Sequence, residues 1–104
     1  MSVPKISHMA TVKATHTHAT APTATIAAVA GQKVYITTAT CSSDKAGSLM
    51  LIKDGTTVIW QVQVGAGKHT ENFDPPLEGS VGAAVSAEID STSAGKANIL
   101  GVQG

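Results

Sequence analysis

The sequence predicts an all-β fold: an antiparallel β-sandwich or jelly roll of about eight short strands, in a single domain. Runs of alternating apolar and polar residues recur about every ten residues, separated by Gly, Pro, Asp or Ser. The chain is 42% hydrophobic but only 3% aromatic, so small and β-branched side chains, which suit closely packed pleated strands, carry most of its apolar content. No stretch has a clear helical pattern, and a parallel sheet would need crossover helices.

The first half of the chain gives three predicted strands. From Ala10 to His18, alanine and valine alternate with threonine and lysine, which indicates a strand with one weakly apolar face. Pro22 ends that strand because proline cannot donate to a central ladder. Thr23–Ala30 reads as an irregular strand, and Lys33–Cys41 as a regular one whose Val34, Ile36, Thr38 and Thr40 face the same way.

A hairpin is predicted over Ser48–Val64, because Asp54-Gly55 separates two apolar runs and readily takes the positive φ angles of a tight turn. An isolated pair of strands is only marginally stable, so this hairpin must belong to a larger sheet. Period-two alternation divides each arm into two faces. In the first arm Leu49 and Leu51 share one face and Met50 and Ile52 the other. In the second arm one face carries Val58, Trp60, Val62 and Val64, and the opposite face carries Ile59, Gln61 and Gln63.

Three further strands complete the predicted fold. His69–Phe73 is short and ends at Asp74-Pro75-Pro76, Val81–Asp90 alternates regularly, and Lys96–Gln103 closes the chain. Polar or glycine-containing loops are predicted between strands at residues 42–47, 65–68 and 91–95.

The domain organisation follows from length and composition. We predict an extended N-terminal arm over residues 1–9 and a sandwich domain over residues 10–104. Because so few aromatic residues leave the core thin, we expect association between copies to supply part of the stability.

Charge and hydropathy restrict the partners. Seven basic and seven acidic residues balance, and no run concentrates either sign, so the chain lacks the dense cationic face that non-specific nucleic-acid binding requires. No stretch approaches the roughly 20 apolar residues of a membrane helix. The N-terminal residues lack a continuous apolar signal core, so we expect synthesis and assembly in a cytoplasm.

Few residues in the sequence suggest a metal-binding, catalytic or sugar-binding site. His16 and His18 would share one strand face and could chelate a transition metal if a three-fold axis supplied further ligands, but half-exposed strand histidines are the favoured interpretation. Cys41 could pair with a histidine as a nucleophile, although a quiet buried thiol is favoured. Tyr35 and Trp60 could form a sugar-stacking platform, but Trp60 is better explained as a core or interface residue. No catalytic, cofactor-binding or metal-binding residue is therefore assigned, and we do not expect an enzyme.

The chain from Thr23 onwards resembles a known group of proteins. The segments that carry the resemblance are Ile26–Gln32, Leu51–Trp60, Phe73–Gly82 and Ala84–Ile89, and their motifs are structural rather than chemical. Their order resembles the small all-β proteins that tailed bacteriophages carry among their structural genes, several of which decorate the capsid or form head fibres as jelly-roll trimers.

The resemblance implies a viral structural protein on the capsid surface of the virion, assembled in the host cytoplasm and acting as a homotrimer on the phage major capsid protein. It implies no catalytic residue, nucleic-acid partner or membrane. We expect Met1 to about Thr20 to reach a neighbour, and the strand faces around Trp60 and Val85 to form the core or trimer seam. The alternative is a phage fibre or adhesion module that binds a carbohydrate or a host receptor.

Overall fold

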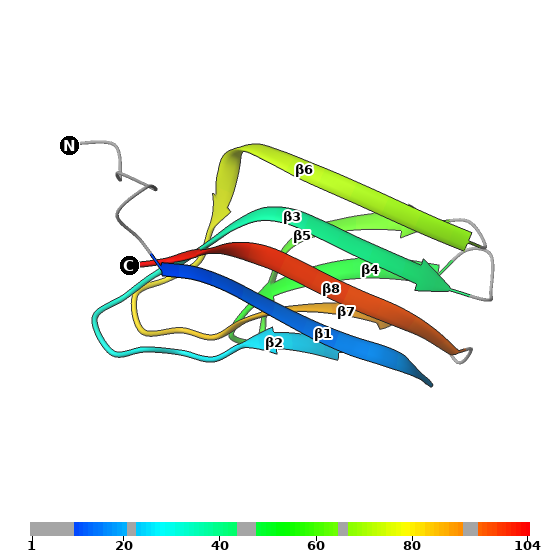
Figure 1. Cartoon of the computed structure of the whole chain (residues 1–104), viewed down its shortest axis with the longest axis horizontal. Helices are drawn as coiled ribbons and strands as arrows, with labels where there is room; N and C mark the ends of the chain where they lie inside the picture. The colour runs from blue at the N-terminus through cyan, green and yellow to red at the C-terminus, as the bar shows by residue number, and fades with distance from the viewer. Residues whose placement is uncertain (1–9, 21–22, 44–47, 65–66, 91–93) are drawn as a thin grey trace.

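The computed structural model of the chain consists of two antiparallel four-stranded sheets that face each other (Figure 1). It describes residues 10–20, 23–43, 48–64, 67–90 and 94–104, with side chains described throughout these ranges except at 16–20, 90 and 94. Sheet 1 has the order β1 (Ala10–Thr20), β8 (Ala94–Gln103), β3 (Val34–Ser43) and β6 (Gly67–Glu78). Sheet 2 has the order β2 (Thr23–Ile26), β7 (Val85–Asp90), β4 (Ser48–Asp54) and β5 (Thr57–Val64).

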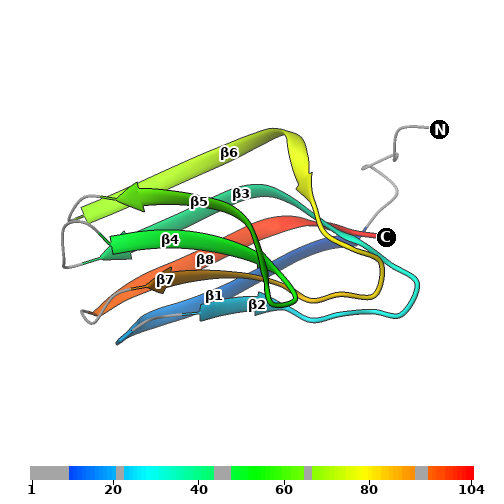
Figure 2. The same cartoon turned by 180° about the vertical axis from the view of Figure 1, so that it is seen from behind.

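The strand pairing is that of one long antiparallel ribbon. Its four pairs are β1 with β8, β2 with β7, β3 with β6, and β4 with β5 at the closed end. Wrapping this ribbon brings β3 beside β8 and β4 beside β7, which joins the pairs into two sheets (Figure 2). This order is the jelly roll of eight strands, so the predicted fold class is confirmed.

The hairpin at the closed end of the ribbon is confirmed, with a shift of one residue in its turn. Asp54 pairs with Thr57, so the two loop residues are Gly55 and Thr56, and Gly55 has a φ of 63°. Asp54 is therefore the last residue of β4 and not a loop residue. Its carboxylate accepts hydrogen bonds from the backbone N–H and the hydroxyl of Ser80, at 3.1 and 2.5 Å. The turn is thereby tied to the loop between β6 and β7.

The core lies between the sheets and is filled by one layer of side chains from each. Its largest fully buried members are Ile36, Met50, Ile52, Ile89, Ile99, Val34, Val85 and Cys41. Two of the three aromatic side chains lie at the margin of this layer, where the Trp60 ring on β5 meets the Phe73 ring on β6 edge to face, with centroids 5.2 Å apart. This contact joins the edge strands of the two sheets, and it is a favourable arrangement for aromatic rings.

Two register shifts overturn predicted strand faces. In β3 the shift between Ile36 and Thr38 places Ala39 in the core, so Thr38 and Thr40 do not share the face of Ile36. In the hairpin the shift between Ile52 and Lys53 pairs Val58 with Lys53, and Val58 is 43% exposed instead of lying beside Trp60. Both predictions were wrong because a bulge inserts one residue and reverses the alternation beyond it.

Some predicted boundaries were also wrong. The strand predicted from Val81 begins only at Val85, and Val81 lies in a loop with 60% of its surface exposed. The strand predicted to end at Phe73 continues as β6 to Glu78, through a cis peptide bond between Asp74 and Pro75.

The structure describes the N-terminal segment from residue 10 onwards, so only that part of the prediction can be compared with it. The segment from Ala10 to Thr20 is β1, an edge strand paired with β8, so the arm does not extend to Thr20. Residues 1–9 lie outside the described residues, as do the centres of the predicted loops at 44–47, 65–66 and 91–93. Within the described ranges, no helix is long and apolar enough to cross a membrane.

Candidate binding face

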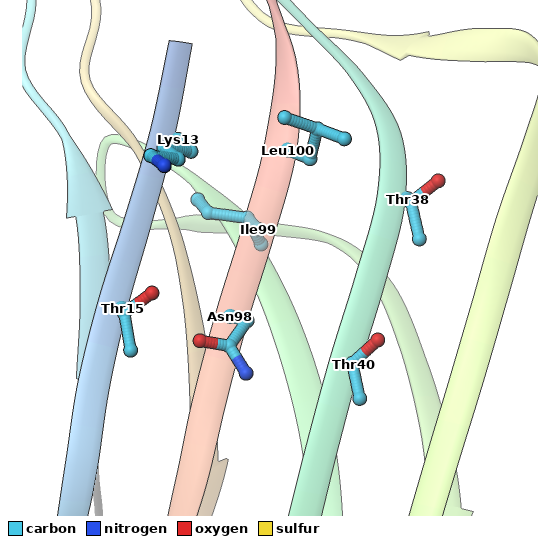
Figure 3. A pocket seen from close by; sticks show the side chains of 7 residues that line it. All are labelled: Lys13, Thr15, Thr38, Thr40, Asn98, Ile99 and Leu100. Atoms are coloured by element: carbon cyan, nitrogen blue, oxygen red, sulfur yellow. The ribbon is translucent and has the colours of Figure 1, made fainter.

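The outer face of sheet 1 carries a shallow hollow of about 310 Å³ over β1, β8 and β3 (Figure 3). Five of its seven lining residues have polar side chains, but apolar atoms make up most of the surface that the hollow presents. The lining residues are Lys13, Thr15, Thr38, Thr40, Asn98, Ile99 and Leu100.

The strand register brings these side chains together in two rows that cross the sheet. In the first row Thr15 lies opposite Asn98, which lies opposite Thr40. In the second row Lys13, Leu100 and Thr38 occupy the corresponding positions. Neighbouring strands are about 4.8 Å apart, so each row offers closely spaced groups to one ligand or one opposing surface.

Hydrogen bonds to the adjacent edge strand fix the β3 side of the hollow. The Thr38 hydroxyl donates to the side-chain oxygen of Asn72 at 3.1 Å, and the hydroxyls of Thr40 and Thr70 are 3.3 Å apart. Within the described part of the chain, the Asn98 amide and the Lys13 ammonium make no hydrogen bond to another side chain. They are therefore available to an external acceptor, and the Asn98 carbonyl is available to an external donor.

This face is not predicted by the sequence pattern. Alternation along β3 places Thr38 and Thr40 on the side that carries Ile36, and the bulge in β3 reverses that assignment. A run of threonines in β3 was the available signal, because consecutive hydroxyl-bearing residues suit a solvent-facing sheet better than a core.

Cys41, His69 and Glu71 are brought together by the pairing of β3 with β6. Cys41 lies opposite His69, and the imidazole Nε2 of His69 is 3.2 Å from a carboxylate oxygen of Glu71. The thiol is 1% exposed, and burial raises the pKa of Cys41 to about 11, against a smaller opposing effect of a backbone hydrogen bond with His69. At pH 7 only about one thiol in ten thousand would be ionised, and the thiolate is the nucleophilic form. The prediction that Cys41 is a buried thiol is confirmed.

The proposed histidine pair is only partly described. His16 pairs with Ala97 and the register shifts between His16 and Ala19, but the side chains of His16 and His18 lie outside the described residues. No group of three His, Cys, Asp or Glu residues that could hold a metal ion occurs in the ranges that the structure describes.

The sugar-stacking platform weighed for Tyr35 and Trp60 is not assembled. Tyr35 is on β3 in sheet 1, whereas Trp60 is on β5 in sheet 2 and packs against the core and Phe73. The interpretation of Trp60 as a residue that packs with the core is confirmed.

Comparison with known proteins does not place this chain in a family. Neither the protein-family models nor the curated proteins searched contain a match to this sequence. The strand order and the face of sheet 1 are therefore the features on which a function can be argued.

Proposed function

We propose that this protein is a structural component of a tailed-phage particle that decorates or cements the capsid as a homotrimer. The observation that carries the proposal is the eight-stranded jelly-roll order, an architecture found in viral capsid and lectin domains. The resemblance of the Asp54-Gly55 hairpin and the Phe73–Pro76 corner to small phage head proteins favours the capsid role among the functions that this fold hosts.

The proposed mechanism is mechanical. A trimer above a local three-fold axis contacts several coat subunits at once, and it binds the assembled shell but not the separated subunits. Any molecule that binds only one of two states shifts the equilibrium towards that state by mass action. The protein would therefore stabilise the assembled shell without chemistry.

The test is binding to capsids of the phage that carries the gene, prepared without this protein. We expect saturable co-sedimentation in multiples of three copies per site, and a higher temperature of capsid disruption. Deleting residues 1–9 should lower the affinity by about tenfold or more, equivalent to about 1.4 kcal/mol, because the proposed arm would no longer reach the coat. Trp60 fluorescence of the truncated protein serves as the control for folding.

Two outcomes would contradict different parts of this proposal. Folded full-length protein that does not bind these capsids contradicts the capsid role. Truncated protein that binds with unchanged occupancy contradicts the role of the arm alone.

The hollow on sheet 1 favours a second candidate, an adhesion module that binds a carbohydrate. Its hydroxyl, amide and ammonium groups match the hydrogen-bonding groups of a sugar, and Leu100 offers an apolar contact. A net hydrogen bond contributes about 1 kcal/mol, so we expect Asn98→Ala to weaken the Kd of a glycan found by array screening by about fivefold. The matched control is Gln61→Ala, an exposed amide on β5 in the other sheet. Equal effects of the two variants, or no glycan bound at all, would remove this candidate.

A further inference from the structure

The pairing of strands in sheet 1 brings lysines from different strands onto its outer face. Lys68 on β6 lies opposite Ser42 on β3, which lies opposite Lys96 on β8. Residues directly opposite in a ladder point to the same side of a sheet. Ser42 lies between the buried Cys41 and Ser43, so this row points away from the core, and both lysines are exposed. The two lysines therefore flank Ser42 on the face that carries the hollow.

Lys13 on β1 belongs to the same face. It lines the hollow and lies opposite Leu100, four residues along β8 from Lys96 (Figure 3). Four residues of strand span about 13 to 14 Å. The row that contains Asn98 lies between them, so hydroxyl and amide groups separate Lys13 from Lys96 across the face.

The acidic residues of sheet 1 lie elsewhere or are already paired. Glu71 lies opposite a buried alanine of β3, so it is on the core side of β6. The Glu78 carboxylate forms an ion pair with the Lys33 ammonium. Asp74 lies where β6 makes no pair with β3, at the opposite edge of the sheet from Lys13. None of the three carboxylates is therefore placed to neutralise the lysines of the outer face.

The ion pairs of the chain leave this face with an excess of positive charge. On sheet 2 the Lys53 ammonium pairs with the Glu88 carboxylate. Among the residues that the structure describes, no ion pair involves Lys13, Lys68 or Lys96. The outer face of sheet 1 is therefore cationic although the whole chain has a formal net charge of zero. Its lysines come from strands far apart in the sequence, so no run of basic residues marks it.

The hollow restricts the shape of a ligand. It is shallow, with a volume of about 310 Å³, and its surface is mostly apolar with a few hydroxyl, amide and ammonium groups. Ligand sites commonly combine an apolar lining with a small number of polar groups. A sugar ring presents C–H groups on its faces and hydroxyls at its edge, so it can pack on Leu100 while it exchanges hydrogen bonds with Asn98. A flat protein surface would not enter the hollow.

We infer that the outer face of sheet 1 binds an acidic polysaccharide, whose sugar rings occupy the hollow and whose carboxylate or sulfate groups contact the three lysines. This inference deepens the adhesion candidate and rests on it. An anionic chain gains Coulomb attraction from Lys13, Lys68 and Lys96, which a neutral sugar does not. A nucleic acid fits less well, because single strands are held by bases stacked on aromatic or arginine side chains. The chain has no arginine, and the rows that carry the hollow and the lysines have no aromatic residue.

The test is binding of fluorescein-labelled oligosaccharides, measured by fluorescence anisotropy. Alginate fragments carry carboxylates, dextran sulfate fragments carry sulfates, and dextran fragments are neutral, so the three probes distinguish the sources of charge. We expect at least one acidic probe to bind about tenfold or more tightly than dextran, and its affinity to fall as salt is raised, because salt screens exposed charges.

Substitution of the lysines locates the site. Lys96→Gln should weaken the Kd of the acidic probe by about two- to fivefold, and the triple replacement of Lys13, Lys68 and Lys96 by Gln should weaken it by about tenfold or more. The matched control is Lys53→Gln, which removes the same charge from sheet 2 and should leave the Kd unchanged.

The outcomes separate this inference from the function on which it rests. A glycan that binds wild type and the triple lysine variant equally, but Asn98→Ala more weakly, would retain the adhesion candidate and overturn the cationic site. Equal losses in Lys96→Gln and Lys53→Gln would also overturn it, because net charge alone would then explain binding. Single-stranded DNA bound more tightly than every acidic probe would assign the face to nucleic acid instead. Failure of all three oligosaccharides to bind would contradict both this inference and the adhesion candidate, and would leave the capsid role intact.

Discussion

We expect Gly101→Ala to destabilise the protein by about 3 kcal/mol or more, because no space for a side chain exists at this position. A Cβ atom on Gly101 would lie 2.0 Å from the Tyr35 carbonyl oxygen and 3.1 Å from the Cα of Ile36. Both contacts are with backbone, so no rotamer change can relieve them. The adjacent strands β8 and β3 would have to separate where they form the middle of sheet 1.

The close approach at Gly101 has a local cause. Ile36 pairs with Gly101 and Thr38 pairs with Leu100, so β3 has one extra residue, Thr37, at this point. The Thr37 hydroxyl donates to the Leu100 carbonyl at 3.1 Å, which holds the bulge against β8. Glycine inside a strand commonly marks such a bulge, because only a residue without Cβ tolerates the short distance between backbones.

The control for this prediction is Gly31→Ala. Gly31 has a φ of 77°, and a Cβ atom at this position would have no other atom within 4 Å, so alanine there costs only the strain of a positive φ, about 1 kcal/mol. Urea denaturation followed by the single tryptophan, Trp60, measures both variants at one protein concentration. Equal losses of stability in the two variants would show that the contact with Tyr35 does not determine the need for glycine.

The fold class could be predicted from the sequence because it depends on patterns that single segments carry. Asp54-Gly55 between two apolar runs specified the hairpin, and the small β-branched residues specified thin, closely packed layers. The order of strands across each sheet could not be predicted, because the pairing of β1 with β8 joins opposite ends of the chain. No local signal encodes a partner that is so distant in sequence.

The candidate binding face could not be predicted for a different reason. Thr38 and Thr40 reach the surface only because the chain inserts Thr37 as an extra residue in β3. A bulge of this kind depends on the neighbouring strand, here on Gly101, and it reverses every side chain beyond it. A second register shift, in the hairpin of β4 and β5, likewise exposes Val58, which the alternation within β5 assigned to the face of Trp60.

The second large effect is expected for Ile36→Ala, which should lower the free energy of unfolding by about 2 to 5 kcal/mol. Ile36 is fully buried in the core between the sheets. Alanine removes three carbon atoms, which costs their transfer free energy and leaves a cavity unless neighbours move into it. The neighbours here are strand residues held by ladders on both sides of β3, so the backbone cannot collapse inwards.

Leu100→Ala provides the matched control for Ile36→Ala, since Leu100 is an apolar residue on the adjacent strand that is 42% exposed. Its truncation should cost less than about 1 kcal/mol, because most of the removed surface is already in water. For a domain of 104 residues, each kcal/mol corresponds to about 4 °C in Tm, so the two variants should melt at clearly different temperatures. Melting must be compared at one protein concentration, because association makes Tm concentration-dependent. Equal losses in Ile36→Ala and Leu100→Ala would mean that stability does not depend on the layer between the sheets, and that contacts between copies dominate it.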